Sequence, residues 1–178
     1  MPALLFSSRW SAAGLALLLF TAQLTGCTGG RTALFEGEVK PEWKEAALEL
    51  PPLPVEKDLI PFQVSPGASA ASYVDGRSLR LDSDGIVRFT LLVRAAGGAE
   101  NLSYEGIRCE TAERKLYAMG RAGSEWVLPR NAEWQRISDN SLNRQYAVLA
   151  KEFFCLPGSV LPTRDEILGA LRNAASLR

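Results

Sequence analysis

Residues 82–94 read DSDGIVRFTLLVR, and this stretch decides the fold. Apolar and polar residues alternate along it, as in a strand with one apolar side: Val87, Phe89, Leu91 and Val93, against Arg88, Thr90 and Arg94. The pattern predicts one face turned to the core and one turned to water or a ligand. The preceding DSDG predicts a hairpin turn in which Gly85 takes a positive φ. A calcium loop is not expected, because Arg80 and Leu91 stand where it needs oxygen ligands.

Short β-type segments on both sides of this stretch predict an antiparallel meander. They cover residues 60–64, 71–74, 78–81, 99–110, 115–121 and 125–128, with short polar or glycine-containing loops between several of them. Short loops favour pairing between consecutive strands.

The apolar period changes to that of helices near the C-terminus. Within residues 143–154, one helical face carries Tyr146, Leu149 and Phe153. Thr163 and Glu166 have the spacing of a capping box and predict a helix over Arg164–Ser176. The expected fold class is α+β, a twisted antiparallel sheet with two C-terminal helices packed on one face.

The first 26 residues predict a lipoprotein signal peptide. A short apolar run over residues 12–20 follows Arg9, and it is too short to cross about 30 Å of hydrocarbon comfortably. Leu24-Thr25-Gly26-Cys27 resembles the bacterial lipobox, in which the cysteine is lipidated and becomes the N-terminus. Two or three acyl chains hold a protein in a membrane durably. Thr28 follows the cysteine, and the lack of Asp at this position resembles an outer-membrane sorting signal. We expect a palmitate-carrying outer-membrane lipoprotein facing the periplasm; the alternative is a retained anchor helix.

Residues 27–59 are expected to connect this anchor to a single domain over residues 60–178. We expect a tether, a short helix over residues 41–49 and a Pro-rich strap over residues 50–54. Pro41 suits the first turn of a helix, and the prolines at 51 and 52 must end it. The prolines predict a stiff strap laid over the domain, and the alternative is a ligand for a partner's aromatic groove.

Composition excludes several classes of function. The 20 Lys+Arg residues balance 20 Asp+Glu residues, so we expect no basic surface for nucleic acid. The sequence contains no histidine, which excludes Ser-His-Asp and Cys-His nucleophiles and imidazole metal sites. Neither a metal nor a cofactor is expected.

Cys109 and Cys155 remain once Cys27 is used for lipid. In an exported, oxidising compartment an even pair predicts a disulfide. The alternatives are two buried thiols, or a reactive Cys109 whose pKa is lowered by Arg108 or by a helix N-terminus.

Several motifs together resemble the CNP-one-like family of uncharacterised proteobacterial envelope proteins. They are DGRSL at 75–79, DGIVRFT at 84–90, NLSYEGIRC at 101–109, YAMG at 117–120, Trp126, Trp134 and Cys155. The resemblance covers residues 41–174. It implies an exported, often lipidated protein, and it brings no catalytic residues to carry over.

A candidate binding face consists of Arg88, Tyr104, Arg108 and Tyr117. Strand alternation places Tyr104 and Arg108 on one side of residues 101–109, opposite Glu105. If Arg88 and Tyr117 share that side, aromatic platforms and two guanidinium forks can hold a carboxylate, a glycan strand or a partner's chain end. The alternative is that the tyrosines fill the sheet–helix core and that Glu105 pairs with an arginine.

No catalytic residues are predicted. Asp75, Asp82, Asp84 and Glu105 can in principle supply the two carboxylates of sugar hydrolysis, but the first three fall at turns. We expect a non-catalytic binding or assembly accessory whose partner is an envelope protein or a cell-wall component. The alternatives are a structural envelope component and a carboxylate-dependent enzyme acting on cell-wall glycan.

Overall fold

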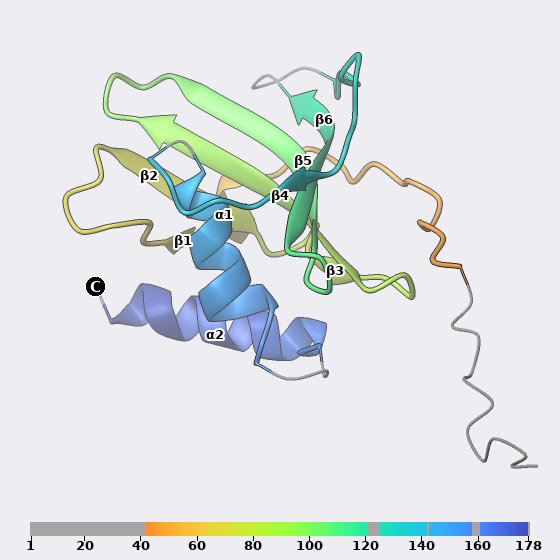
Figure 1. The fold of residues 1–178 in the computed structure, drawn as a ribbon. Coiled ribbons are helices and arrows are strands. Elements are labelled where there is room, and N and C mark those ends of the chain that lie inside the picture. The colour runs from red at the N-terminus through yellow and green to blue at the C-terminus, as the bar shows by residue number, and fades with distance from the viewer. Residues whose placement is uncertain (1–41, 121–124, 142, 158–160, 178) are drawn as a thin grey trace, which may run out of the picture. The chain divides into compact units, whose positions relative to one another are not determined.

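The computed structural model describes residues 42–120, 125–141, 143–157 and 161–177, so the predicted signal peptide, Cys27 and most of the tether lie outside the described residues. One seven-stranded antiparallel sheet has the order β1-β2-β4-β5-β6-β7, with β3 paired to β4 (Figure 1). The strands are β1 (Leu59–Phe62), β2 (Ala70–Asp75), β3 (Arg80–Leu81), β4 (Ile86–Ala95), β5 (Glu100–Arg108), β6 (Glu113–Gly120) and β7 (Gln135–Arg136). The predicted antiparallel sheet is confirmed.

Strand β4 is the centre of the sheet because it pairs with β2, β3 and β5. The hairpin before it is confirmed: the amide of Gly85 donates to the carbonyl of Asp82 over 3.0 Å, and Gly85 has a φ of 77°. The outer segments differ from the prediction. Residues 125–128 form one bridge, Met119 with Val127, and the pair β6–β7 was not expected.

Two helical segments pack on one face of the sheet, as predicted (Figure 1). Helix α1 (Arg144–Val148) continues as the π-helical segment η2 (Leu149–Phe154), and α2 (Arg164–Ser176) follows. The amide of Thr163 donates to Glu166 over 2.7 Å, and the amide of Glu166 donates to the Thr163 hydroxyl over 3.3 Å, which confirms the capping box. The core under these helices includes Phe89, Ile107, Leu149, Phe154 and Leu171.

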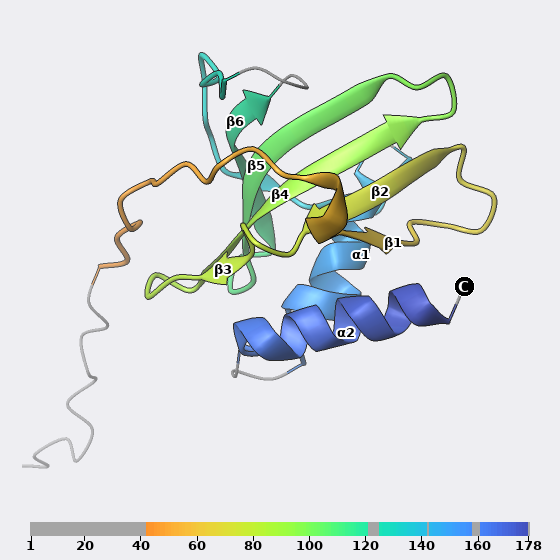
Figure 2. The same ribbon diagram turned by 180° about the vertical axis from the view of Figure 1, so that it is seen from behind.

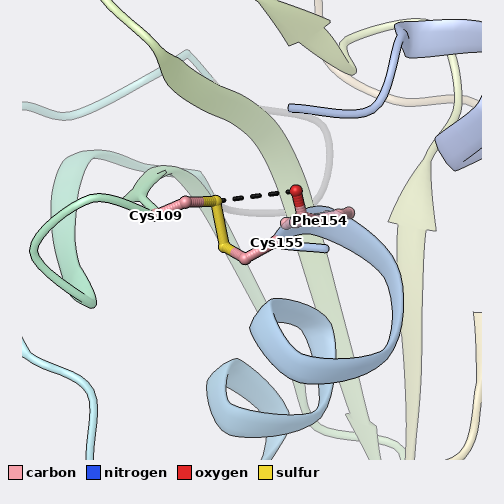
Figure 3. The surroundings of a disulfide bond; sticks show 3 residues. All are labelled: Cys109, Phe154 and Cys155. Carbon is pink, nitrogen blue, oxygen red and sulfur yellow. Dashed lines mark hydrogen bonds between the residues drawn. A yellow bond between two sulfur atoms is a disulfide. The ribbon is translucent and has the colours of Figure 1, made fainter. Parts of the chain in front are cut away.

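The disulfide between Cys109 and Cys155 is confirmed (Figure 3). It joins the residue after β5 to the residue after η2, with Cα atoms 5.4 Å apart. Cys109 Sγ also lies 3.5 Å from the carbonyl oxygen of Phe154. The link ties the sheet to the helical layer directly.

The predicted helix over residues 41–49 is wrong from residue 42 onward, because residues 42–49 belong to no helix. We call residues 42–54 the N-terminal arm. The arm runs across the sheet face opposite the helices (Figure 2). Trp43 and Glu45 both contact that face, at Arg108 and Lys115. Side chains two residues apart do not share a face of a helix, so these contacts are incompatible with the predicted helix.

Among the described residues, no helix combines the length and the apolarity that a bilayer crossing requires.

Candidate functional site

The four residues of the candidate binding face gather on one side of the sheet, where the alternation placed Tyr104 and Arg108 together. The rings of Tyr104 and Tyr117 lie 5.9 Å apart between centroids, and the Arg88 guanidinium lies 5.3 Å from the Tyr117 ring. Arg108 reaches the same side, where its guanidinium stacks 3.9 Å from the ring centroid of Trp43.

A β-bulge in β6 places Tyr117 in this group. The register pairs Tyr104 with Ala118 and Glu105 with Leu116, so the ladder skips Tyr117. Tyr117 and Ala118 then pack with Tyr104 and half-buried Trp126 in a small core of their own. A bulge re-aims side chains on its strand, and here it turns the tyrosine toward Arg88.

The N-terminal arm covers this face, and the prediction of an open face is therefore wrong. Arg88, Tyr104 and Tyr117 are 0%, 0% and 4% exposed. The Arg108 side chain is 16% exposed. The alternative location is also wrong, because the tyrosines form a second core under the arm and not part of the sheet–helix core.

The arm is held through polar contacts with its backbone and with Trp43. The Trp43 indole donates to the carbonyl of Asp84 over 2.9 Å, and the Asp84 carboxylate accepts the amide of Ala46 over 2.8 Å. Further along, the Trp126 indole donates to the carbonyl of Pro51 over 2.6 Å. This last contact holds Pro51 of the predicted Pro-rich strap against the domain.

Glu45 of the arm occupies a carboxylate site on the sheet. It accepts a hydrogen bond from Tyr117 over 2.7 Å and one from Lys115 over 2.9 Å, and Arg88 lies 3.8 Å away. Burial acts to raise the pKa of Glu45, but the hydrogen bonds from Lys115 and Tyr117 outweigh it and hold the pKa below its usual range. The site therefore stabilises the ionised form.

Arg88 is a fully buried cation whose charge is balanced by the hairpin before β4. It donates to Asp82 over 2.6 Å and to Asp84 over 2.7 Å. Burial acts to lower the pKa of Arg88, but pairing with Asp84 raises it. A buried charge is tolerated when it is paired and hydrogen-bonded, and these two turn acids meet that condition.

A second candidate site lies on the opposite face, where Glu105 stands at a concavity of about 560 Å³. Glu105 is 1% exposed and accepts hydrogen bonds from Ser103 over 2.6 Å and Tyr146 over 2.9 Å, with Arg114 at 3.4 Å. Burial raises the pKa of Glu105, and these three partners offset that effect only in part. Glu105 does pair with an arginine, but the pair joins β5 to β6 and does not fix a turn, as the alternative had it. The apolar wall of the concavity includes Leu102, Leu116, Met119 and Val127.

The four acids considered for sugar hydrolysis do not converge. Asp75 accepts the amides of Arg77 and Ser78 in its own turn, and Asp82 and Asp84 balance Arg88. Glu105 contacts Tyr146 of α1 on the other side of the sheet. Within the described ranges, no group of three or more His, Cys, Asp or Glu side chains is placed to hold a metal ion.

The residues that sequence reasoning missed are Trp43, Glu45 and Lys115. Trp43 packs edge-on against Trp134, with centroids 6.2 Å apart, and Trp134 packs in turn against Tyr117 at 6.5 Å. The available signal was the spacing of Trp43 and Glu45, two residues apart in front of a proline stretch, which suits an extended segment.

Comparison with known proteins agrees with the motifs that surround this site. The model of the CNP1-like family matches residues 38–172, which include the arm, the sheet, both cysteines of the disulfide and most of α2. The chain belongs to the CNP1-like family.

A curated relative in Neisseria gonorrhoeae supports this assignment. It is named "Cryptic neisserial protein 1" and is 31% identical over 134 residues, which cover 66% of this chain and 66% of the relative. The match thus spans just under two thirds of the relative's length. No solved structure matches the chain.

Proposed function

We propose that this CNP1-like chain is a lipoprotein, anchored by Cys27 at the outer membrane, whose domain is a non-catalytic binding or envelope-assembly module facing the periplasm. The observation that carries the proposal is the disulfide between Cys109 and Cys155, because disulfides persist in exported compartments. The sequence Leu24-Thr25-Gly26-Cys27 supports lipid anchoring at the same destination.

Anchoring gives a small domain a function that needs no catalysis. A protein held on a membrane meets its neighbours at a raised effective concentration, so modest contacts suffice for binding. The carboxylate site of Lys115 and Tyr117 and the concavity beside Glu105 are two places on the domain with the polar groups that such contacts use.

Substitution of Cys27 tests the anchor. In a Gram-negative host grown with labelled palmitate, the wild-type chain should carry the label and fractionate with the outer membrane at mature mass. Cys27→Ala should carry no label and remain unprocessed or soluble. The matched control, Cys109→Ala/Cys155→Ala, should keep the label. Fractionation of Cys27→Ala with the outer membrane at mature mass would refute the anchor.

Crosslinking in intact cells tests the binding role. A module for assembly should capture a few membrane proteins, and a wall binder should co-purify with the cell wall. If the chain is recovered in neither form while its anchor is intact, a purely structural role in the envelope replaces the binding role.

One observation favours an enzyme as the second candidate. A buried carboxyl group with a raised pKa beside a concavity is a common feature of active sites, and Glu105 has both properties. Turnover of cell-wall glycan by the purified chain, abolished by Glu105→Gln, would establish this candidate in place of the binding module.

A further inference from the structure

The domain contacts the N-terminal arm in the way that a receptor contacts a bound peptide. We call the receiving surface the arm groove; its contact residues include Asp84, Arg108, Lys115, Tyr117, Trp126 and Trp134. Asp84 accepts a backbone amide of the arm over 2.8 Å, and Trp126 donates to a backbone carbonyl over 2.6 Å. Recognition of both kinds of main-chain group selects a polypeptide.

The groove makes specific contacts with two side chains of the arm. The first is aromatic: Trp43 stacks under Arg108 and packs against Trp134. The second is a carboxylate: Glu45 receives hydrogen bonds from Lys115 and Tyr117. Aromatic stacking on a guanidinium and charge-assisted hydrogen bonds to a carboxylate are both selective contacts.

The charge of the groove requires an acidic occupant. The hairpin acids balance Arg88, whereas Lys115 forms its ion pair with Glu45. Departure of the arm would leave the Lys115 ammonium without this carboxylate, beside the hydroxyl of Tyr117. An entering carboxylate would restore both interactions.

The arm is also weakly built into the domain. All of residues 42–54 are described by the structure, and none of them belongs to a strand. Leu48 and Leu50 are 40% and 39% exposed, and the ion pair of Glu49 with Arg80 lies at the surface. Segments with few buried apolar contacts open at low free-energy cost, so the arm can be displaced while the sheet stays folded.

We infer that the arm groove binds an extended segment of a partner protein that carries a tryptophan two residues before a carboxylate. Without the partner, the chain's own Trp43 and Glu45 fill the groove and compete with that segment. The inference rests on the proposed binding role but not on lipidation of Cys27. Peptide binding by the groove and lipid anchoring can therefore fail separately. The arm of a second copy is the rival occupant.

A labelled peptide tests the groove directly. The probe is a fluorescein-labelled peptide of residues 41–54, and its matched control carries Gln in place of Glu45. Fluorescence anisotropy is measured with two full-length chains in detergent, the wild type and Trp43→Ala/Glu45→Ala. The double variant should bind the probe about tenfold or more tightly than the wild type, because its own arm no longer competes. The Gln peptide should bind about tenfold more weakly, the effect of losing a charged hydrogen bond.

Tyr117→Phe in the double-variant background removes one donor to the carboxylate and should weaken binding of the Glu peptide more than that of the Gln peptide, because a hydrogen bond to a charged acceptor is the stronger one. If the double variant fails to fold, Glu45→Gln alone replaces it, since its shape is unchanged. Equal binding of the two peptides, or no binding by a folded variant, would overturn the inference. A wild-type dimer that disappears in the double variant would also overturn it, in favour of arm exchange between copies.

Discussion

Removal of the disulfide is the change whose magnitude the structure defines best. Cys109 and Cys155 are 46 residues apart in the sequence, so the bond closes a long loop in the unfolded chain. Closing a loop of this length removes about 14 cal/mol/K of chain entropy, or about 4 kcal/mol at 25 °C. Cys109→Ala/Cys155→Ala should therefore lower the free energy of unfolding by about 4 kcal/mol.

Urea titration followed by circular dichroism measures this loss. The midpoint should fall, and the slope of free energy against urea should rise, because an uncrosslinked unfolded chain is more expanded. At about 3–4 °C per kcal/mol, the melting temperature should fall by about 12–16 °C. Cys27→Ala is the matched control, because it removes a cysteine outside the bond and should leave the domain's stability unchanged.

Two results would refute the reasoning. Alkylation of the denatured, non-reduced wild type should modify neither Cys109 nor Cys155, so two reactive thiols at these positions would show that the bond does not form. A double variant within about 1 kcal/mol of the wild type would show that the unfolded chain is already compact around these residues.

Three further substitutions test other contacts by the same titration. Thr163→Ala removes the N-cap of α2 and should lower the free energy of unfolding by about 1 kcal/mol, whereas Thr163→Asn should lose less. Gly106→Ala should cost about 2 kcal/mol, because its Cβ would lie 2.8 Å from Tyr117 Cε2; Gly97, with nothing within 4 Å, is the control site. The pKa of Glu105 is raised in the folded state, so the protonated carboxyl group favours folding. This contribution to the free energy of unfolding is complete below the usual pKa of 4.5 and is lost as pH rises through the folded pKa. Glu105→Gln should therefore gain stability relative to the wild type as pH rises, and a constant difference would contradict this.

Local signals predicted the parts of the fold that depend on neighbouring residues. The turn ending at Gly85 and the alternation after it predicted the hairpin and β4, and the capping box at Thr163 predicted α2. The disulfide followed from the count of cysteines in an exported chain, without any knowledge of distance. Each of these features is specified within a few residues or by chemistry alone.

The arm could not be predicted in the same way, because its conformation depends on residues far along the chain. Nine residues make a marginal helix at best, since isolated helices shorter than about 12–15 residues are unstable in water. The sheet supplies the partners that decide the outcome: Lys115 and Tyr117 for Glu45, and Asp84 for the backbone. No local pattern in residues 41–49 encodes those partners.

The polar face of β4 shows that an alternating strand pattern can lead either to a solvent-exposed face or to a buried one. Arg88 and Thr90 alternate with apolar residues as on a solvent-facing strand, yet both are fully buried. Burial of Arg88 is possible because Asp84 and Asp82, four and six residues before it, bring the compensating charges within the hairpin itself. Such local contacts form with little loss of loop entropy, and they do not require the arm to be bound. Arg88 therefore stays paired when the arm leaves, and the charge that loses its ion-pair partner is the Lys115 ammonium.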